Sequence, residues 1–215
     1  GKKRLPGFSG EWKLEILSTL FKRVNTRNQG QSTNVVTISA QQGLIKQEEF
    51  FKKTVASEVL DNYFLLKKGQ FAYNKSYSQG FPMGVFKRLN RYEVGVVTTL
   101  DICFEIKDVA KCNSDFFEHY FEHGSLNQAL EKVANEGGRA HGLLNVKPDD
   151  FFSLKLPYPP LPEQAAIAKV LSAAVAVIAQ YEAKLANLQS QKKALMQQLL
   201  TGKKRVKVDA PAEIS

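Results

Sequence analysis

Residues Glu163–Leu200 read EQAAIAKVLSAAVAVIAQYEAKLANLQSQKKALMQQLL, a stretch that contains neither Gly nor Pro. Apolar residues recur along it at alternating intervals of four and three, a spacing that places them on one side of an α-helix. At about 1.5 Å per residue such a helix extends roughly 57 Å, beyond the reach of a small globular body. The stretch therefore predicts a long helix whose apolar side needs a second helix to cover it.

One polar residue, Lys192, interrupts this apolar side. Such a residue fixes the register in which two helices pair, or allows pairing with a helix that does not match perfectly, and it lowers the stability of the pair. An ordinary helix packed on its own domain is the alternative, but such helices usually run about 8 to 20 residues. We call the following set the seam residues: Ile167, Leu171, Ala174, Ile178, Tyr181, Leu185, Leu188, Lys192, Leu195 and Leu199.

The composition sets the class of protein. Of the 215 residues 43% are hydrophobic, enough for one packed domain plus an appendage. No run approaches about 18 consecutive apolar residues and no apolar segment follows the basic N-terminus, so we expect no membrane span and no signal peptide. Cys103 and Cys112 show no metal-ligand spacing with His119, His123 and His141, which favours a reduced, cytoplasmic protein.

The net charge of +9 is unevenly distributed. No acid lies between Asp61 and Glu93, where basic residues fall among aromatic ones, and residues 16–47 are also free of acids. Residues 101–150, by contrast, are rich in acids. This polarisation is typical of a protein with one phosphate-facing surface, and a solvated basic face without a ligand is the alternative.

Local patterns predict an α+β domain over residues 1–156, with a mixed or antiparallel sheet and short helices. Strict alternation from Leu100 to Lys107 predicts a half-buried strand. We expect Ser114 and Ser125 to be the N-caps of two helices. The other expected elements are strands at 34–38, 63–66, 70–73 and 84–89, a polar surface loop at 76–82, and the two helices at 115–121 and 126–134.

The proline run at residues 157–162 predicts a stiff hinge, because proline fits neither a helix interior nor a central strand. Pro162 suits the first helical position, so we expect the long coiled-coil helix at 163–201, as spacer or dimerisation element, and a basic flexible tail at 202–215. The tetrapeptide at 1–4, Gly-Lys-Lys-Arg, recurs at 202–205. A tandem duplication would place two such copies one repeat length apart.

In order along the chain, several segments together resemble one half of the specificity subunit of type I DNA restriction-modification enzymes. They are LPGFSGEW at 5–12, GQFAYNK at 69–75, GLLN at 142–145, LP at 156–157 with PLPEQ at 160–164, and LMQQLLTG at 195–202. Family members usually carry two target-recognition domains and two conserved helical regions, whereas this chain has one of each. The repeated tetrapeptide suggests the C-terminal half.

The resemblance implies a non-catalytic, sequence-specific module for double-stranded DNA that reads one half of a split target. Two adenine methyltransferase subunits would dock on the specificity subunit, and restriction subunits would join them. S-adenosylmethionine and ATP would belong to those partners, so we expect no cofactor in this chain. Because the second helical region is absent, we expect two copies to pair their seams antiparallel in a homodimer.

The residues themselves indicate no chemistry. No phosphate-binding glycine loop is present. The triplet Glu105-Ile106-Lys107 resembles part of a metal-dependent nuclease site, but Pro148-Asp149 lies downstream of it rather than upstream. His119 and His123 lack a third ligand. We therefore expect no catalytic residue and no metal site.

Side chains that can bind phosphates or hydrogen-bond to bases are better represented than catalytic groups. A coiled-coil scaffold whose basic patch binds protein is the alternative to DNA recognition, and salt-dependent affinity would separate the two. The expected DNA-binding residues are Lys46, Tyr73, Asn74, Lys75, Ser76, Tyr77, Gln79, Lys87, Arg88, Arg91 and Arg139.

Overall fold

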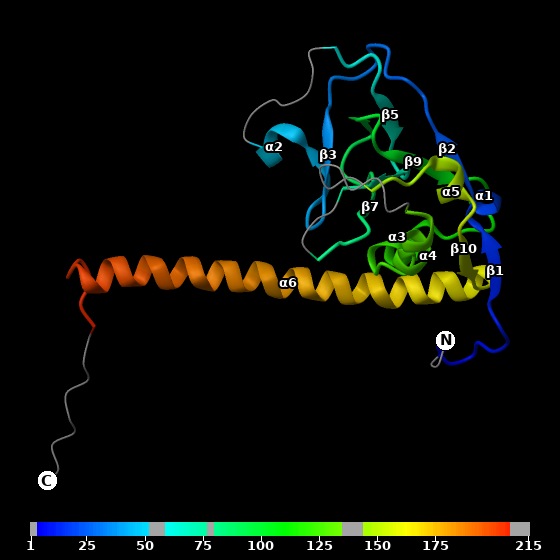
Figure 1. The fold of residues 1–215 in the computed structure, drawn as a ribbon. Helices are drawn as coiled ribbons and strands as arrows, with labels where there is room; N and C mark the ends of the chain where they lie inside the picture. Colours follow the sequence, from blue (N-terminus) through cyan, green and yellow to red (C-terminus); the bar gives the residue numbers. More distant parts are fainter. Residues whose placement is uncertain (1–3, 52–58, 77–79, 135–143, 207–215) are drawn as a thin grey trace, which may run out of the picture. The chain divides into compact units, whose positions relative to one another are not determined.

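The computed structural model describes residues 4–51, 59–76, 80–134 and 144–206 (Figure 1). The chain divides into two compact units, Gly1–Lys169 and Val170–Ser215, and the division falls inside helix α6 (Leu161–Leu200). All the strands and helices α1 to α5 belong to the first unit. The α+β class expected from the sequence is confirmed.

The central sheet has four antiparallel strands in the order β2-β9-β6-β7. Its register places Phe71 opposite both Phe104 on β9 and Arg88 on β7. The strands are β2 (Phe21–Val24), β6 (Phe71–Asn74), β7 (Val85–Arg88) and β9 (Ile102–Ile106).

Three antiparallel pairs complete the described strands. They are β1 (Lys13–Ile16) with β10 (Lys155–Tyr158), β3 (Val36–Ser39) with β4 (Gly43–Lys46), and β5 (Phe64–Lys67) with β8 (Val94–Val97).

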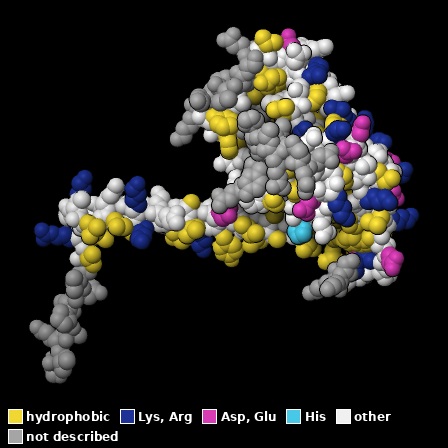
Figure 2. Space-filling view, viewed as in Figure 1, with side chains coloured by type: hydrophobic (Ala, Val, Ile, Leu, Met, Phe, Trp, Pro, Cys, Tyr) yellow, Lys and Arg dark blue, Asp and Glu magenta, His cyan; other side chains and the backbone are white. Residues whose placement is uncertain are grey.

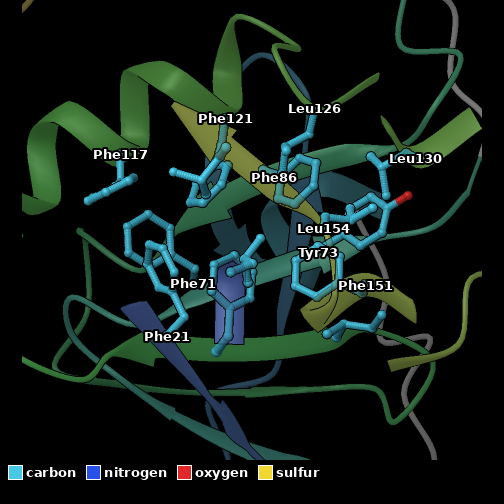
Figure 3. Close-up of a cluster of buried hydrophobic side chains, with 14 of the residues drawn as sticks. Phe21, Phe71, Tyr73, Phe86, Phe117, Phe121, Leu126, Leu130, Phe151 and Leu154 are labelled. Atoms are coloured by element: carbon cyan, nitrogen blue, oxygen red, sulfur yellow. The ribbon is translucent and has the colours of Figure 1, made fainter. Parts of the chain in front are cut away.

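A hydrophobic cluster lies on each face of the central sheet. On one face Phe71 and Phe104 belong to a large aromatic cluster (Figure 3), and on the other Ala72 and Cys103 belong to a second, smaller cluster. Neighbouring residues of a strand point to opposite faces, so a strand between two cores is buried throughout. The strand expected between Leu100 and Lys107 is confirmed as β9, but its one-sided burial is wrong: Ile102, Cys103 and Phe104 are all buried, and Leu100 lies exposed before the strand.

The short helices are α1 (Leu17–Leu20), α2 (Gln47–Phe51), α3 (Ser114–Glu122), α4 (Asn127–Val133) and α5 (Pro148–Phe152). The N-cap of α3 is Asn113, whose side chain accepts from Phe116 N at 2.9 Å, and not Ser114 as expected. Helix α4 follows Leu126 without a side-chain cap, so Ser125 is not its N-cap either.

The proline run is divided between two elements. Pro157 and Tyr158 end β10, and Pro157 lies opposite Leu14 of β1. A two-stranded sheet tolerates this proline because one side of the strand has no ladder partner. Helix α6 begins at Leu161, so Pro162 lies in its first turn, where a missing N–H costs no intrahelical bond.

The first turns of α6 are fixed in the core of the first unit by Glu163, Gln164 and Ala168, which are all buried. From Lys169 to Leu200 every residue of the helix is exposed. Among the described helices, α6 is long and apolar enough to cross a membrane by length and composition alone, with a mean hydropathy of 1.5 in its most apolar window. One such helix is weak evidence for a span.

Candidate nucleic-acid interface

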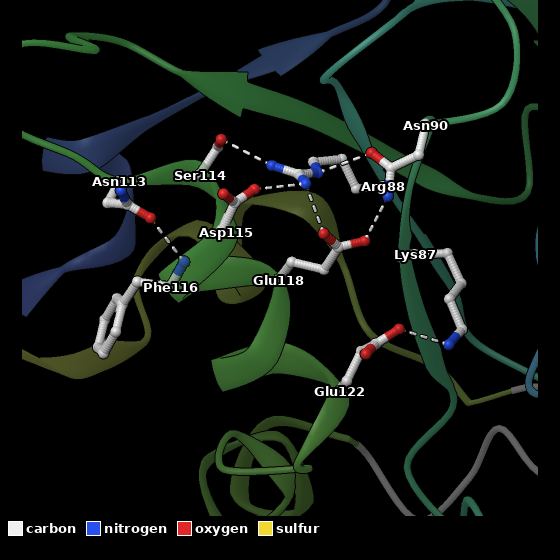
Figure 4. Close-up of polar contacts among 9 residues, drawn as sticks. All are labelled: Lys87, Arg88, Asn90, Asn113, Ser114, Asp115, Phe116, Glu118 and Glu122. Carbon is white, nitrogen blue, oxygen red and sulfur yellow. Dashed lines mark hydrogen bonds and ion pairs between the residues drawn. The ribbon is translucent and has the colours of Figure 1, made fainter. Parts of the chain in front are cut away.

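The acid-free stretch between Asp61 and Glu93 is not free of acids in space. Its segment Lys87-Arg88 lies on β7, and α3 packs against that strand. Helix α3 carries Asp115, Glu118 and Glu122 at intervals of three and four, which places the carboxylates on one side of the helix. They meet the two cations of β7 (Figure 4).

Arg88 is surrounded by acceptors. Its Nη2 forms ion pairs with Asp115 Oδ1 and Glu118 Oε2, both at 2.6 Å, and its Nη1 donates to Ser114 Oγ at 2.6 Å. Its Nε donates to Asn90 Oδ1 at 2.8 Å, and its side chain is 13% exposed. Burial raises the pKa of Glu118, and Arg88 acts in the opposite direction by favouring the charged carboxylate.

Lys87 is held in the same way, with its Nζ 2.6 Å from Glu122 Oε1 and its side chain 11% exposed. A phosphate would have to displace three carboxylates to reach Lys87 and Arg88. Helix α3, from another part of the chain, thus neutralises both cations, and their assignment to DNA binding stays a prediction.

Arg91 and Lys46 do lie at the surface. The Arg91 side chain is 54% exposed, with Nη1 3.4 Å from Glu49 Oε2, and its guanidinium lies 5.7 Å from the centroid of the Tyr92 ring. Lys46 is exposed, and its backbone N–H donates to Tyr92 Oη at 3.4 Å. Their assignment to DNA binding stays a prediction.

Tyr73 was expected on the DNA-facing loop, and this is wrong. The residue has no exposed surface, stacks on Phe86 with ring centroids 4.2 Å apart, and donates its hydroxyl proton to Met83 O at 2.8 Å (Figure 3). Burial raises the pKa of this phenol well above its ordinary value. Tyr73 belongs to β6, and its side chain points to the aromatic core rather than along the loop that follows.

The next three residues, Asn74, Lys75 and Ser76, are half-buried. Asn74 Oδ1 accepts from Ser76 N at 2.7 Å, so this side chain stabilises the turn of the chain that follows β6. Lys75 has a pKa lowered by burial, although Asp101 nearby favours its charged form. Three other expected DNA-binding residues, Tyr77, Gln79 and Arg139, lie outside the described residues.

Asp101 was not singled out from the sequence. Its carboxylate is buried beside Thr98, whose hydroxyl donates to Oδ2 at 3.1 Å. Burial raises its pKa to about 6, and the Thr98 hydrogen bond and the Lys75 charge oppose that rise. The alternation from Leu100 to Lys107 placed Asp101 on the polar side of the expected strand, whereas the structure buries it just before β9.

Nine of the ten seam residues, Leu171 to Leu199, are exposed on α6. The exception is Ile167, which is half-buried against the aromatic core of the first unit. Ile167 is thus held by its own domain, whereas side chains such as Ile178, Leu185 and Leu188 keep 56%, 56% and 52% of their surface exposed.

The residues considered for chemistry have structural partners. Glu105 forms an ion pair with Lys22 at 2.9 Å, and Lys107 donates to Ser18 O at 2.6 Å. His123 Nδ1 lies 2.9 Å from Ser125 Oγ. No group of three or more His, Cys, Asp or Glu side chains suited to a metal ion occurs within the described part of the chain.

Solved structures that are similar to this chain include the following three. A chain from a type I restriction-modification system, studied for its complex assembly and conformational transition, matches with a TM-score of 0.60 and 17% identity over 98% of this chain. The HsdS subunit of Thermoanaerobacter tengcongensis matches with a TM-score of 0.56 and 16% identity over 98% of this chain. The type I S subunit of M. genitalium matches with a TM-score of 0.52 and 17% identity over 90% of this chain.

This chain covers 53%, 53% and 46% of those chains, which is about half of their length. No family model and no curated protein matches the sequence. The comparisons show a shared fold: the chain is built like one half of a type I specificity subunit.

Proposed function

We propose that this chain is a half-length specificity module of a type I restriction-modification system, which binds double-stranded DNA and performs no catalysis. The observation that carries the proposal is the fold shared over 98% of the chain with structures from such systems. The first unit would read one half of a split target. Adenine methyltransferase subunits, with their S-adenosylmethionine, would dock on the module, and restriction subunits with ATP would join them in the cytoplasm.

The exposed seam supports a homodimer as the working form. A row of side chains from Leu171 to Leu199 lies open along α6, and a second copy offers an identical row. An antiparallel pair would bury both rows and close the assembly by two-fold symmetry. Two identical recognition units would then read a palindromic split target.

A coiled-coil scaffold remains the second candidate because Lys87 and Arg88 are already paired with carboxylates. A scaffold would bind duplex DNA weakly and without a defined site. DNA recognition predicts an affinity that falls linearly with salt on logarithmic axes, with a slope of about −0.9 for each phosphate neutralised.

The decisive experiment combines the chain with the methyltransferase subunit of its own system and maps the methylated adenines in DNA. We expect methylation at one split, palindromic sequence, and none when either component is omitted. The control pairs the same methyltransferase with the Leu185→Asp, Leu188→Asp variant, which should lose the palindromic pattern. Methyl transfer by the chain alone, or methylation without a defined sequence, would contradict the proposal.

A further inference from the structure

The positive charge of the chain is concentrated near its C-terminal end. Residues 183–208, which we call the basic segment, contain no acid. The segment carries a charge of +7, which leaves only +2 of the total +9 for all other residues. Its cations are Lys184, Lys192, Lys193, Lys203, Lys204, Arg205 and Lys207.

The structure describes this segment as far as residue 206, and the six cations in that part are all exposed. Figure 2 shows Lys and Arg side chains gathered toward the C-terminal end of α6. The ion pairs of the described residues involve cations from Arg4 to Lys111 only, so the charge of the basic segment is uncompensated in that part of the chain.

Lys203, Lys204 and Arg205 are held close to the end of α6. Gly202, with φ at 73°, ends α6 in the left-handed region that favours glycine. Lys204 N then donates to Gln198 O at 3.0 Å, so residues 203–205 turn back toward the last turn. Cations stabilise a helix C-terminus, but this effect falls off within the last turn and does not account for Lys184, Lys192 and Lys193.

We propose that the described part of the basic segment, residues 183–206, binds the phosphate backbone of double-stranded DNA regardless of sequence, while the first unit supplies the sequence preference. The choice of ligand rests on the proposed function. From Lys184 to Leu200 the helix rises roughly 24 Å, along which duplex DNA presents one phosphate for about every 1.7 Å of its axis. Lysine is depleted in protein interfaces, and six of the seven cations are lysines, which favours phosphate over an acidic protein.

The test replaces Lys193, Lys203, Lys204 and Arg205 by Gln, which spares Lys192 in the seam. A matched control replaces four exposed cations of the first unit, Lys13, Lys132, Lys147 and Lys155, by Gln. The affinity of each full-length protein for a duplex of random sequence is measured by fluorescence anisotropy over a salt series. A third variant, Lys193→Arg with Lys203→Arg and Lys204→Arg, keeps the charge.

We expect the segment variant to bind at least about tenfold more weakly at low salt, with a salt slope shallower by about 3 to 4, because each lost phosphate contact changes the slope by about 0.9. The control and the charge-keeping variant should retain the wild-type slope. Unchanged binding by the segment variant, an equal loss in the control, or no DNA binding by the wild-type chain would overturn the inference.

Co-purification with the methyltransferase subunit and the mapping of methylated adenines distinguish a failure of this inference from a failure of the proposed function. If the segment variant binds DNA normally but no longer co-purifies with the methyltransferase subunit, the segment contacts protein and the inference fails, although the proposed function stands. If the wild-type chain binds duplex DNA through the segment yet directs no methylation, the proposed function fails and the inference stands.

Discussion

The guanidinium of Arg4 binds the carboxylate of Glu163 through two hydrogen bonds, Nε to Oε1 at 2.6 Å and Nη2 to Oε2 at 2.5 Å. Glu163 has no exposed surface, and Trp12 Nε1 donates to the same Oε2 at 3.0 Å. A buried carboxylate is stable only when its charge is paired and its oxygens are hydrogen-bonded. The hydrogen bond from Trp12 to Glu163 therefore joins two of the segments on which the family resemblance rests, LPGFSGEW and PLPEQ, inside the first unit.

Removing Arg4 should destabilise the first unit strongly. We expect Arg4→Ala to lower the free energy of unfolding by about 3 to 5 kcal/mol, because it leaves the Glu163 charge buried without its partner. Urea denaturation followed by Trp12 fluorescence measures the effect. The exposed Lys13→Ala should change stability by no more than about 0.5 kcal/mol. A loss in Arg4→Ala no larger than in this control would show that the pair does not hold the unit together.

Asp101 predicts a pH dependence of stability. Its pKa is raised from 3.8 to about 6 in the folded state, so folding binds the proton more tightly than the unfolded chain does. The resulting stability is fully present below about pH 4 and is lost as the pH rises through about 6. Asp101→Asn should remove this dependence and raise stability at neutral pH by about 1 to 3 kcal/mol.

Urea denaturation at a series of pH values checks this prediction. The exposed Asp61→Asn serves as control and should keep the wild-type pH profile. If Asp101→Asn also keeps that profile, the carboxyl of Asp101 is not the group that titrates.

Charge reversal should lower the stability of the protein much more at Arg88 than at Arg91. Arg88→Glu would place a third carboxylate against Asp115 and Glu118, and we expect it to cost about 3 kcal/mol or more. Arg91→Glu changes a side chain that is 54% exposed and should cost no more than about 0.5 kcal/mol. Thermal unfolding of both variants gives the comparison, and equal losses would argue against the α3 network as the reason.

Tyr73→Phe tests a buried hydroxyl. The change leaves Met83 O without its donor and should cost about 1 to 3 kcal/mol, while DNA affinity of the folded protein stays the same. Tyr181→Phe, at a ring that is 69% exposed, is the control for stability. A selective loss of DNA affinity without a loss of stability would restore Tyr73 to the DNA-binding set.

The seam should govern association. Each buried leucine contributes about 1.5 to 3 kcal/mol, so Leu185→Asp with Leu188→Asp should abolish dimers at micromolar concentration. Ala183→Asp with Ala186→Asp introduces the same charges on the opposite side of α6 and should leave association unchanged. Sedimentation equilibrium distinguishes these cases. A wild-type chain that stays monomeric, or a seam variant that associates equally well, would exclude this interface.

Much of the fold followed from local patterns. β-branched and aromatic runs located β3, β5, β6 and β7 to within one or two residues, because strand preference is written into neighbouring side chains. Strands β1, β2, β4, β8 and β10 and the short helices α1, α2 and α5 were not anticipated. Several of these strands form through partners far along the chain, as Lys13 and Tyr158 pair in β1 and β10, and helices of four or five residues are too short to show a period.

The sequence by itself determined the long helix and its exposed stripe, because a helical period needs no information from outside the segment that carries it. It also placed the excess of cations in residues 183–208. Only the tertiary structure decided which cations are free. Lys87 and Arg88 lie 35 and 27 residues from Glu122 and Asp115, and they pair because α3 packs on β7. Tyr73 is buried for the same kind of reason: a strand enclosed by two cores hides both of its sides, whatever its own sequence pattern suggests.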